Sequence, residues 1–384
     1  MNKTLEELFE QTEFLKPEMM KTWAFLVNRD CGSEDKEGVD KVGQDIKAFL
    51  EPIGFKVHFH KYKKAGDMLV AEYGDMSKPF VVITGHMDTV FHKGDSAARP
   101  FKVKDGIVTG PGCLDMKGGI TIMLYAVKSL IEAGYDKYPL KIILAGDEEV
   151  GHGQSDAGKD YIKEVTGALM GFNMETSYMN NGVVVERKGA VRYHWDFYGV
   201  GAHSGNNPQD GRSAVQEMCH KAIDMEKLTD FEEGTTVNVG VVSGGTVPNA
   251  IPDHAECTVD VRYKTQSGLD RIAKGFEEIA KKQYIPDTKT VTVLTTRVEA
   301  MERLNSTMEL FDKANAIVKA NGLRELKAIA VGGGSDSAYL TKVGVPCLCA
   351  MGVRGEFNHT VREYAEEASL VDRTKVLLAL LTEL

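Results

Sequence analysis

Two polar side chains follow a short apolar run early in the chain. The stretch 83–90 reads ITGHMDTV, and it places His86 and Asp88 two residues apart, directly after PFVVI. At the end of a buried strand, an imidazole can bind a metal ion while a nearby carboxylate orients the ring. A single histidine at a strand end is more often a hydrogen-bonded structural residue. The pair therefore indicates a metal site only if further ligand residues occur elsewhere in the chain.

Further polar residues stand after other apolar runs or before a helix. They are Asp115 in GPGCLDMKGG, Glu149 in LKIILAGDEEVG, Glu175 in ALMGFNMETS and His359 in LCAMGVRGEFNHT. Taken singly, an Asp before a helix is usually an N-cap, and adjacent acids in a loop usually face solvent. Taken together with His86, they form a set of two imidazoles and three carboxylates, which suits two zinc-like ions with one carboxylate bridging.

The segments that must position these residues alternate between helix and strand. The pattern predicts amphipathic helices over residues 16–27 and 38–50, a strand KVHFH, a helix from DMKGG to Gly134, and a strand LKIILAG. Strands that alternate with helices predict a doubly wound, mostly parallel sheet of the α/β class. In such sheets ligands bind beyond the carboxyl ends of the strands.

The order of predicted strands and helices changes between residues 190 and 300. A strand VRYHWDFYG, a helix near 210–227, two strands, a helix over 269–283 capped by Ser267, and a strand VTVLTT follow in order. That βαββαβ order predicts a ferredoxin-like α+β domain. We therefore expect a catalytic domain in two parts, 1–189 and 301–384, interrupted by an inserted domain at 190–300.

Bulk composition excludes several classes of protein. The net charge is −10 and no dense Lys/Arg block occurs, which argues against nucleic acid or an anionic membrane as a partner. No apolar run is long enough to span a bilayer, and the first residues lack the apolar core of a secretory signal. The six cysteines are scattered without a C-x-x-C pair, which predicts reduced thiols and a cytoplasmic location.

Several ordered motifs resemble those of the M20 family of co-catalytic zinc metallopeptidases. GHMDTV, GPGCLDMKGG, DEEVG, the later Glu175 and NHT carry the resemblance, and it is closest to the glutamate carboxypeptidase branch. GAHSG, VPNAIPDHAECTVDVRY and GGGSDSAYL match that branch in order and spacing. The resemblance implies a catalytic α/β domain with an inserted lid or dimerisation domain, and a homodimer formed through the insert.

The resemblance also assigns metal ligands. It implies two Zn²⁺ per subunit, with Co²⁺ or Mn²⁺ as alternatives that the same ligands accept. His86 and Glu175 would hold one ion, Glu149 and His359 would hold the other or be shared, and Asp115 would bridge the two.

Three further roles follow from the same resemblance. Glu148 would be the general base, since it stands beside the ligand Glu149 but points elsewhere. Asp88 would accept the free N–H of the His86 ring. His203 of GVGAHSG would stabilise the tetrahedral intermediate, although a loop histidine in a glycine-rich turn could look the same.

Residues in the later motifs would contact substrate. Asn249 and Arg262 lie in the inserted domain, and the planar fork of an arginine suits a carboxylate. A salt bridge at a strand edge is the alternative for Arg262. Ser335 lies on the glycine-rich turn GGGSDS, where capping of the next helix explains it equally well.

These assignments predict a metal-dependent hydrolase that cleaves a peptide or an N-acyl amino acid and releases a C-terminal amino acid. An N-acyl-amino-acid deacylase or a dipeptidase with the same site is the alternative. Release of glutamate is disfavoured, because Glu299 stands where the glutamate-releasing enzymes carry a basic residue. A non-catalytic metal-binding dimer would be expected to lack Glu148, and no phosphate-binding glycine motif supports a nucleotide enzyme.

Overall fold

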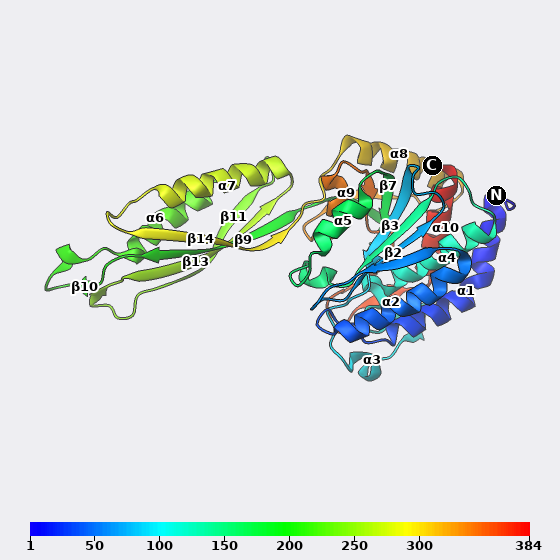
Figure 1. The fold of residues 1–384 in the computed structure, drawn as a ribbon, viewed down its shortest axis with the longest axis horizontal. Coiled ribbons are helices and arrows are strands. Elements are labelled where there is room, and N and C mark those ends of the chain that lie inside the picture. Colours follow the sequence, from blue (N-terminus) through cyan, green and yellow to red (C-terminus); the bar gives the residue numbers. More distant parts are fainter. The chain divides into compact units, whose positions relative to one another are not determined.

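The computed structural model describes residues 1–384, and the chain forms two compact units. The first unit contains Met1–Glu186, Arg303–Val331 and Ser335–Leu384, and the second contains Arg187–Glu302 with Gly332–Gly334. The second unit therefore interrupts the first, close to the predicted insert at 190–300. Both ends of the chain belong to the first unit (Figure 1).

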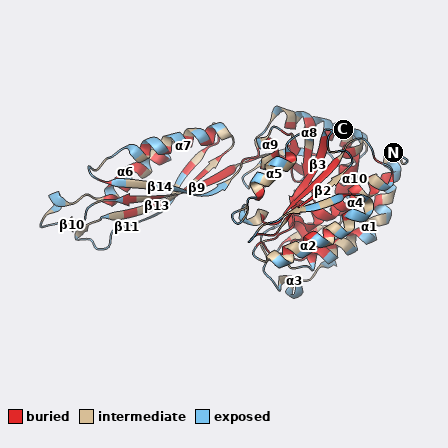
Figure 2. Cartoon of the chain, viewed as in Figure 1, coloured by how far each residue is buried: buried red, intermediate tan, exposed pale blue.

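The first unit is built on a six-stranded sheet in the order β1-β2-β6-β3-β7-β16. Strands β6, β3, β7 and β16 are parallel, whereas β2 runs antiparallel to both β1 and β6. Every residue of β3 and β6 is buried, as expected for central strands covered on both faces (Figure 2). The strands are β1 (Lys56–His60), β2 (Met68–Tyr73), β3 (Phe80–His86), β6 (Leu140–Ala145), β7 (Ala168–Asn173) and β16 (Cys347–Leu348).

Helices pack on both faces of this sheet (Figure 1). On one face α1, α4 and α10 contact one another, and α2 contacts α4. On the other face α5 contacts α9 and β6. The arrangement is the predicted doubly wound, mostly parallel fold. The helices are α1 (Leu5–Val27), α2 (Lys36–Leu50), α3 (Asp95–Ala98), α4 (Gly118–Glu132), α5 (Ala157–Val165), α8 (Asn305–Ala320), α9 (Ser337–Lys342) and α10 (Glu367–Glu383).

The first helix is longer than the sequence pattern predicts. It begins at Leu5 rather than near residue 16, because Thr4 and Glu7 form a capping box in which each side chain accepts from the backbone of the other. Pro17 lies inside this helix. Because proline is rare inside helices, the sequence around Pro17 gives little sign of the earlier start.

Short strands surround the main sheet. Strands β4, β5, β18 and β17 form an antiparallel sheet, and β8 pairs with β15. Their bounds are β4 (Lys102–Lys104), β5 (Ile107–Thr109), β8 (Gly182–Arg187), β15 (Lys327–Val331), β17 (Gly355–Glu356) and β18 (Tyr364–Glu366).

The second unit has the predicted βαββαβ order. Its antiparallel sheet β11-β13-β9-β14 packs on α6 and α7 around buried residues such as Trp195 and Phe197. Helix α7 begins at Gln266, one turn earlier than predicted, because the Thr265 side chain rather than Ser267 caps it. The elements are β9 (Gly189–Tyr198), β10 (Ala202–His203), α6 (Ala214–Glu226), β11 (Thr236–Gly244), β12 (Ala250–Ile251), β13 (His254–Tyr263), α7 (Gln266–Lys281) and β14 (Lys289–Val298).

Candidate active site

Polar residues from separate segments gather at one edge of the first unit's sheet. His86 is the last residue of β3, Glu149 follows the neighbouring strand β6, and Glu175 follows β7 on the other side. Asp115 lies in the turn Cys113–Lys117 that leads into α4, and His359 follows β17. Because β3, β6 and β7 are parallel, their carboxyl ends meet at this edge.

The five residues form two groups that share Asp115. In the first group, His86 Nε2 lies 3.2 Å from Asp115 Oδ1 and 3.6 Å from Glu175 Oε1. In the second, His359 Nε2 lies 3.2 Å from Asp115 Oδ2 and 3.0 Å from Glu149 Oε2. Each group offers one imidazole nitrogen and two carboxylate oxygens within 4.8 Å of one another, a donor set suited to a borderline divalent cation.

The charges in these groups perturb one another strongly. Hydrogen bonds with Asp115 and Glu149 raise the pKa of His359 to about 11. Burial opposes a charge on His86, yet Asp115 and Asp88 raise the pKa of that ring well above its usual value. Burial likewise opposes ionisation of Asp115, but His359 and His86 hold its pKa below the usual range. The carboxylates therefore attract positive charge to this edge of the sheet.

Asp88 is fully buried and organises the loop after β6. Its carboxylate accepts from the Ser33 hydroxyl at 2.7 Å and from the backbone N–H groups of Glu148 and Glu149 at 3.1 and 3.2 Å. The His86 Nδ1 atom lies 3.0 Å from the Asp88 carbonyl oxygen and 3.4 Å from its carboxylate. The nearest acceptor for the ring is thus the backbone of Asp88, because its carboxylate is occupied by the loop.

Glu148 and Glu149 differ in surroundings although they are adjacent. Burial raises the pKa of Glu148 well above its usual value, and the carboxylates of Glu175 and Asp336 add to the shift although His86 opposes it. Glu149 Oε2 contacts His359, while its Oε1 is buried without a hydrogen-bond partner. Burial also raises the pKa of Glu149, although its hydrogen bond with His359 opposes the shift. Both acids therefore hold a proton more readily than a solvent-exposed glutamate, and only Glu149 contacts the imidazole.

A pocket of 570 Å³ opens beside Glu149. It is lined by the segments 32–35 and 89–93, together with Glu149 and Val150. His92 and Lys93 are the basic residues among these segments.

Two supporting residues escaped the sequence analysis. Glu363 is buried, and its carboxylate accepts from the backbone N–H groups of Gly112, Leu114 and Asp115, each at 2.9 Å. Asn358 donates to Asp115 Oδ2 at 3.0 Å. Asn358 precedes His359 in the NHT motif and could have been noticed, whereas Glu363 stands in REYAEE and looks like a surface acid.

His152 lies in no matched motif, so the sequence predicts only a surface or packing role for it. The structure buries it in a polar network behind the Glu148 loop. Its Nδ1 lies 2.8 Å from Asp147 Oδ1 and its Nε2 lies 2.7 Å from Asp336 Oδ1. Its only signal in the sequence was its position three residues after Glu149.

His203 and Asn249 belong to the second unit. His203 is exposed on β10, and its Nδ1 accepts from the backbone N–H groups of Gly205 and Asn206 at 3.1 Å. The ring proton therefore resides on Nε2, which points away from this turn as a donor. Asn249 is exposed, and its carbonyl accepts from Ser204 N at 3.0 Å.

Arg262 and Ser335 make local contacts. Arg262 lies on the inner strand β13, not at a sheet edge, and pairs with Asp260 at 2.8 Å. Ser335 belongs to the first unit, is buried, and accepts from Ser337 N at 3.2 Å as α9 begins. This contact lies just before α9, whose N-cap residue is Asp336.

Similarity to known proteins identifies the family to which this fold and this group of polar residues belong. The profile of peptidase family M20/M25/M40 matches residues 82–383, and the chain belongs to that family. It is therefore a peptidase or amidohydrolase, and members of the family bind a pair of metal ions. None of the helices combines the length and the hydrophobicity of a membrane-spanning segment.

Individual relatives cover nearly the whole chain. Carboxypeptidase G2 of Pseudomonas sp. (strain RS-16) is 28% identical over 384 residues, spanning 98% of this chain and 92% of that protein. Succinyl-diaminopimelate desuccinylase of Rickettsia rickettsii (strain Sheila Smith) is 25% identical over 350 residues, spanning 85% and 90%. The crystal structure of aminopeptidase PepT from Bacillus cereus ATCC 10987 has a TM-score of 0.78 at 21% identity, covering 95% of this chain and 98% of that one. This likeness confirms the predicted fold, a catalytic domain with an inserted lid.

Proposed function

We propose that this protein is a dinuclear metal-dependent carboxypeptidase, which cleaves the amide bond of a peptide or N-acyl amino acid and releases a C-terminal amino acid. The observation that carries the proposal is the pair of ligand groups that share Asp115, with Glu148 beside the ligand Glu149. A single structural ion would need only one of these groups.

The donor set fits two borderline cations. Glu149 Oε1 is buried without a hydrogen-bond partner, which costs free energy unless a cation or another donor reaches it. Asp115 offers one oxygen to each group, as a bridging carboxylate must. His86 and Glu175 would hold one ion and Glu149 and His359 the other. We propose Zn²⁺, with Co²⁺ or Mn²⁺ as alternatives.

The chain's own residues would move the protons. When bound, the metal pair lowers the pKa of water and polarises the substrate carbonyl. Glu148 would take the proton of the attacking water and deliver it to the leaving nitrogen. Burial raises the pKa of Glu148, so its carboxylate accepts a proton more readily than that of a solvent-exposed glutamate. Asp88 would keep Glu148 in position, because its carboxylate accepts a hydrogen bond from the Glu148 backbone N–H.

Residues of the inserted unit would bind substrate. His203 carries its proton on Nε2, so it can donate to the oxygen that gains negative charge in the tetrahedral intermediate. Asn249 would contact the same substrate, and Arg262 would pair with a carboxylate, in exchange for its contact with Asp260. We retain Ser335 as a weaker candidate, because its hydroxyl is committed to the start of α9.

The released residue is proposed not to be glutamate. Glu299 accepts from Arg297 at 2.9 Å, so that arginine is already paired with an acid.

The order of the strands supports a homodimer that forms through the inserted unit. Strand β11 is an edge strand, and Val241 and Val242 on it are 63% and 58% exposed. A second copy would cover an edge that otherwise invites aggregation.

An N-acyl-amino-acid deacylase is the second candidate. The likeness to a desuccinylase over most of the chain favours it. Both functions use the same hydrolytic residues and differ in the group on the acyl side of the amide.

The test is amino-acid release from a panel of dipeptides and N-acyl amino acids by the zinc-loaded protein. The Glu148→Gln variant should retain its zinc and lose about 10²–10⁴-fold in rate, whereas Glu37→Gln, an exposed acid paired with Lys41, should behave as the unmodified protein. Preference for N-acyl substrates would favour the deacylase. If the Glu148→Gln variant hydrolysed substrate as fast as the unmodified protein, the role of Glu148 as general base would be contradicted. Glutamate as the preferred product would contradict the proposed specificity.

A further inference from the structure

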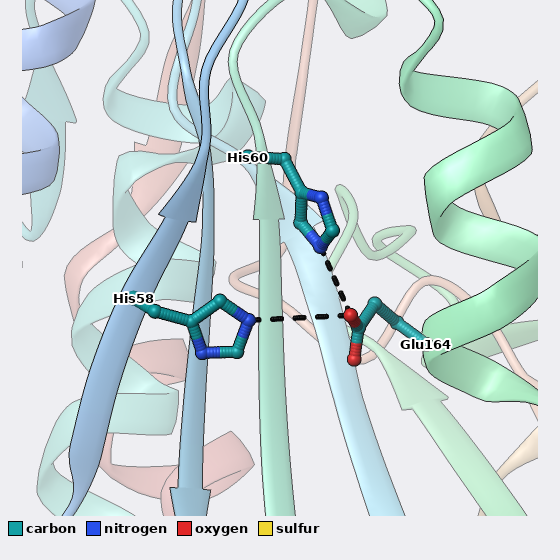
Figure 3. Close-up of side chains that lie close together, drawn as sticks. All are labelled: His58, His60 and Glu164. Carbon is teal, nitrogen blue, oxygen red and sulfur yellow. Dashed lines mark hydrogen bonds and ion pairs between the residues drawn. The ribbon is translucent and has the colours of Figure 1, made fainter.

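Two histidines on an edge strand face one carboxylate, away from the active-site residues. His58 and His60 alternate on β1, so both side chains lie on the same face of the sheet. Glu164 comes from α5, which covers that face. Figure 3 shows both rings directed at this glutamate. From the sequence, the alternation in KVHFH predicts only that the two histidines share an exposed face of the strand.

Both rings present the same atom to the same oxygen. His60 Nε2 lies 2.9 Å from Glu164 Oε1, and His58 Nε2 lies 4.0 Å from it (Figure 3). The first distance is a hydrogen bond, and the second is too long for one. The three atoms lie within 4.8 Å of one another. Convergence of two imidazole nitrogens and a carboxylate oxygen is the ligand arrangement of zinc and related cations.

Glu164 and His60 also contact charged groups outside this cluster. Lys141 Nζ binds the other oxygen of Glu164, Oε2, at 2.9 Å, and Glu72 offsets the lysine charge at 3.1 Å. His60 Nδ1 faces Asp160 Oδ2 at 3.7 Å. Such outer contacts fix the orientation of metal-binding carboxylates and imidazoles. Glu164 Oε1 and the two Nε2 atoms face one another, and a cation would replace the hydrogen bond between His60 and Glu164.

An ion could reach this position from solvent. His58 is half exposed, and β1 is the edge strand of the sheet. We propose that His58, His60 and Glu164 form a further divalent-cation site, for zinc or a similar borderline ion, that fastens β1 to α5. Solvent water would complete the coordination. The site uses none of the residues proposed for catalysis, so it stands whatever the protein hydrolyses.

The test compares zinc content in the full-length protein after dialysis against buffered, low-micromolar free zinc. The His58→Gln/His60→Gln variant should hold one zinc fewer per chain than the unmodified protein. His220→Gln, which removes an exposed histidine of the second unit, should hold the same number as the unmodified protein. Asp160→Asn should weaken zinc binding at this site about 10–100-fold, as loss of an outer contact does.

His58→Gln alone guards against a folding defect, because it keeps the hydrogen bond between His60 and Glu164 while removing a ligand. It should also lose the additional zinc. Equal zinc content and affinity in the double variant and the unmodified protein would overturn the proposal. So would loss of the catalytic zinc together with hydrolysis, since that would assign the missing ion to the active site.

Discussion

Replacing Glu363 with glutamine tests how the Asp115 turn is held in place. The glutamate is 2% exposed; Oε1 accepts from Leu114 N and Asp115 N, and Oε2 accepts from Gly112 N. Gly112 has a φ of 70°, a conformation that suits glycine, so this turn is a specific shape that the carboxylate stabilises. A glutamine amide can place its oxygen at only one of the two positions.

The expected cost follows from these contacts. If the amide oxygen faces Leu114 and Asp115, the Gly112 N–H meets an NH₂ group and stays unsatisfied, which costs about 1–3 kcal/mol. The other two hydrogen bonds lose their charge assistance, roughly 1 kcal/mol each. We therefore expect Glu363→Gln to lower the free energy of unfolding of the first unit by about 3–5 kcal/mol. Displacement of Asp115 should weaken zinc binding about 10–100-fold.

One of the two tryptophans reports on this turn directly. Trp23 donates to the Cys113 carbonyl at 3.0 Å, whereas Trp195 lies in the core of the second unit. Urea unfolding followed by fluorescence in a Trp195→Phe background therefore monitors the first unit. Glu356→Gln, an exposed glutamate nearby, is the control. A shift below about 0.5 kcal/mol with unchanged zinc affinity would refute the role of Glu363, since surface substitutions give shifts of that size.

Three other perturbations have expected outcomes. His203→Ala should lower kcat about 10²–10³-fold with unchanged zinc content, measured by steady-state hydrolysis. His152→Gln should cost about 3 kcal/mol in urea unfolding, because it leaves the carboxylates of Asp147 and Asp336 buried without their cation. Burial lowers the pKa of His152, but Asp336 and Asp147 raise it well above its usual value. The charged ring therefore stabilises the folded protein fully below about pH 6.5, and this stabilisation is lost as the pH rises through the pKa of the folded state. The stability of the His152→Gln variant should not show this decrease. Removal of metal by a chelator should lower the urea midpoint of unfolding reported by Trp23 fluorescence, because the clustered carboxylates then repel one another. An unchanged midpoint would argue against a structural contribution of the ions.

Local patterns predicted the elements better than their pairing. The alternation of helix and strand and the βαββαβ order of the insert are visible in the sequence, since each depends on short periodicities. The antiparallel β2 between β1 and β6 is not, because strand order depends on contacts between distant segments. The early start of α1 depended on a capping box of two residues, which the nearby Pro17 obscured.

The same division separates the active-site residues that were predicted from those that were missed. His86 ends a strand, Glu149 and Glu175 follow shortly after strands, and the sheet brings strand ends together. Glu363 and His152 act on backbone or carboxylate groups that are remote or hidden in the sequence. Nothing local distinguishes a buried acid that accepts three N–H groups from an acid on a solvated loop.

The order of the strands supports one assignment of ligands to ions. Strand β3 lies between β6 and β7, so His86 has Glu149 on one side and Glu175 on the other. Neighbouring strands are about 4.8 Å apart, and paired metal ions in hydrolases are about 3.5–4 Å apart. The proposed pair of ions would therefore be held by residues from adjacent strands, with Asp115 offering one oxygen to each group. His86 contacts Glu175 and not Glu149 at short range, and His359 contacts Glu149. The proposed ligands would thus divide along the sheet, with His86 and Glu175 on the β7 side and Glu149 and His359 on the β6 side.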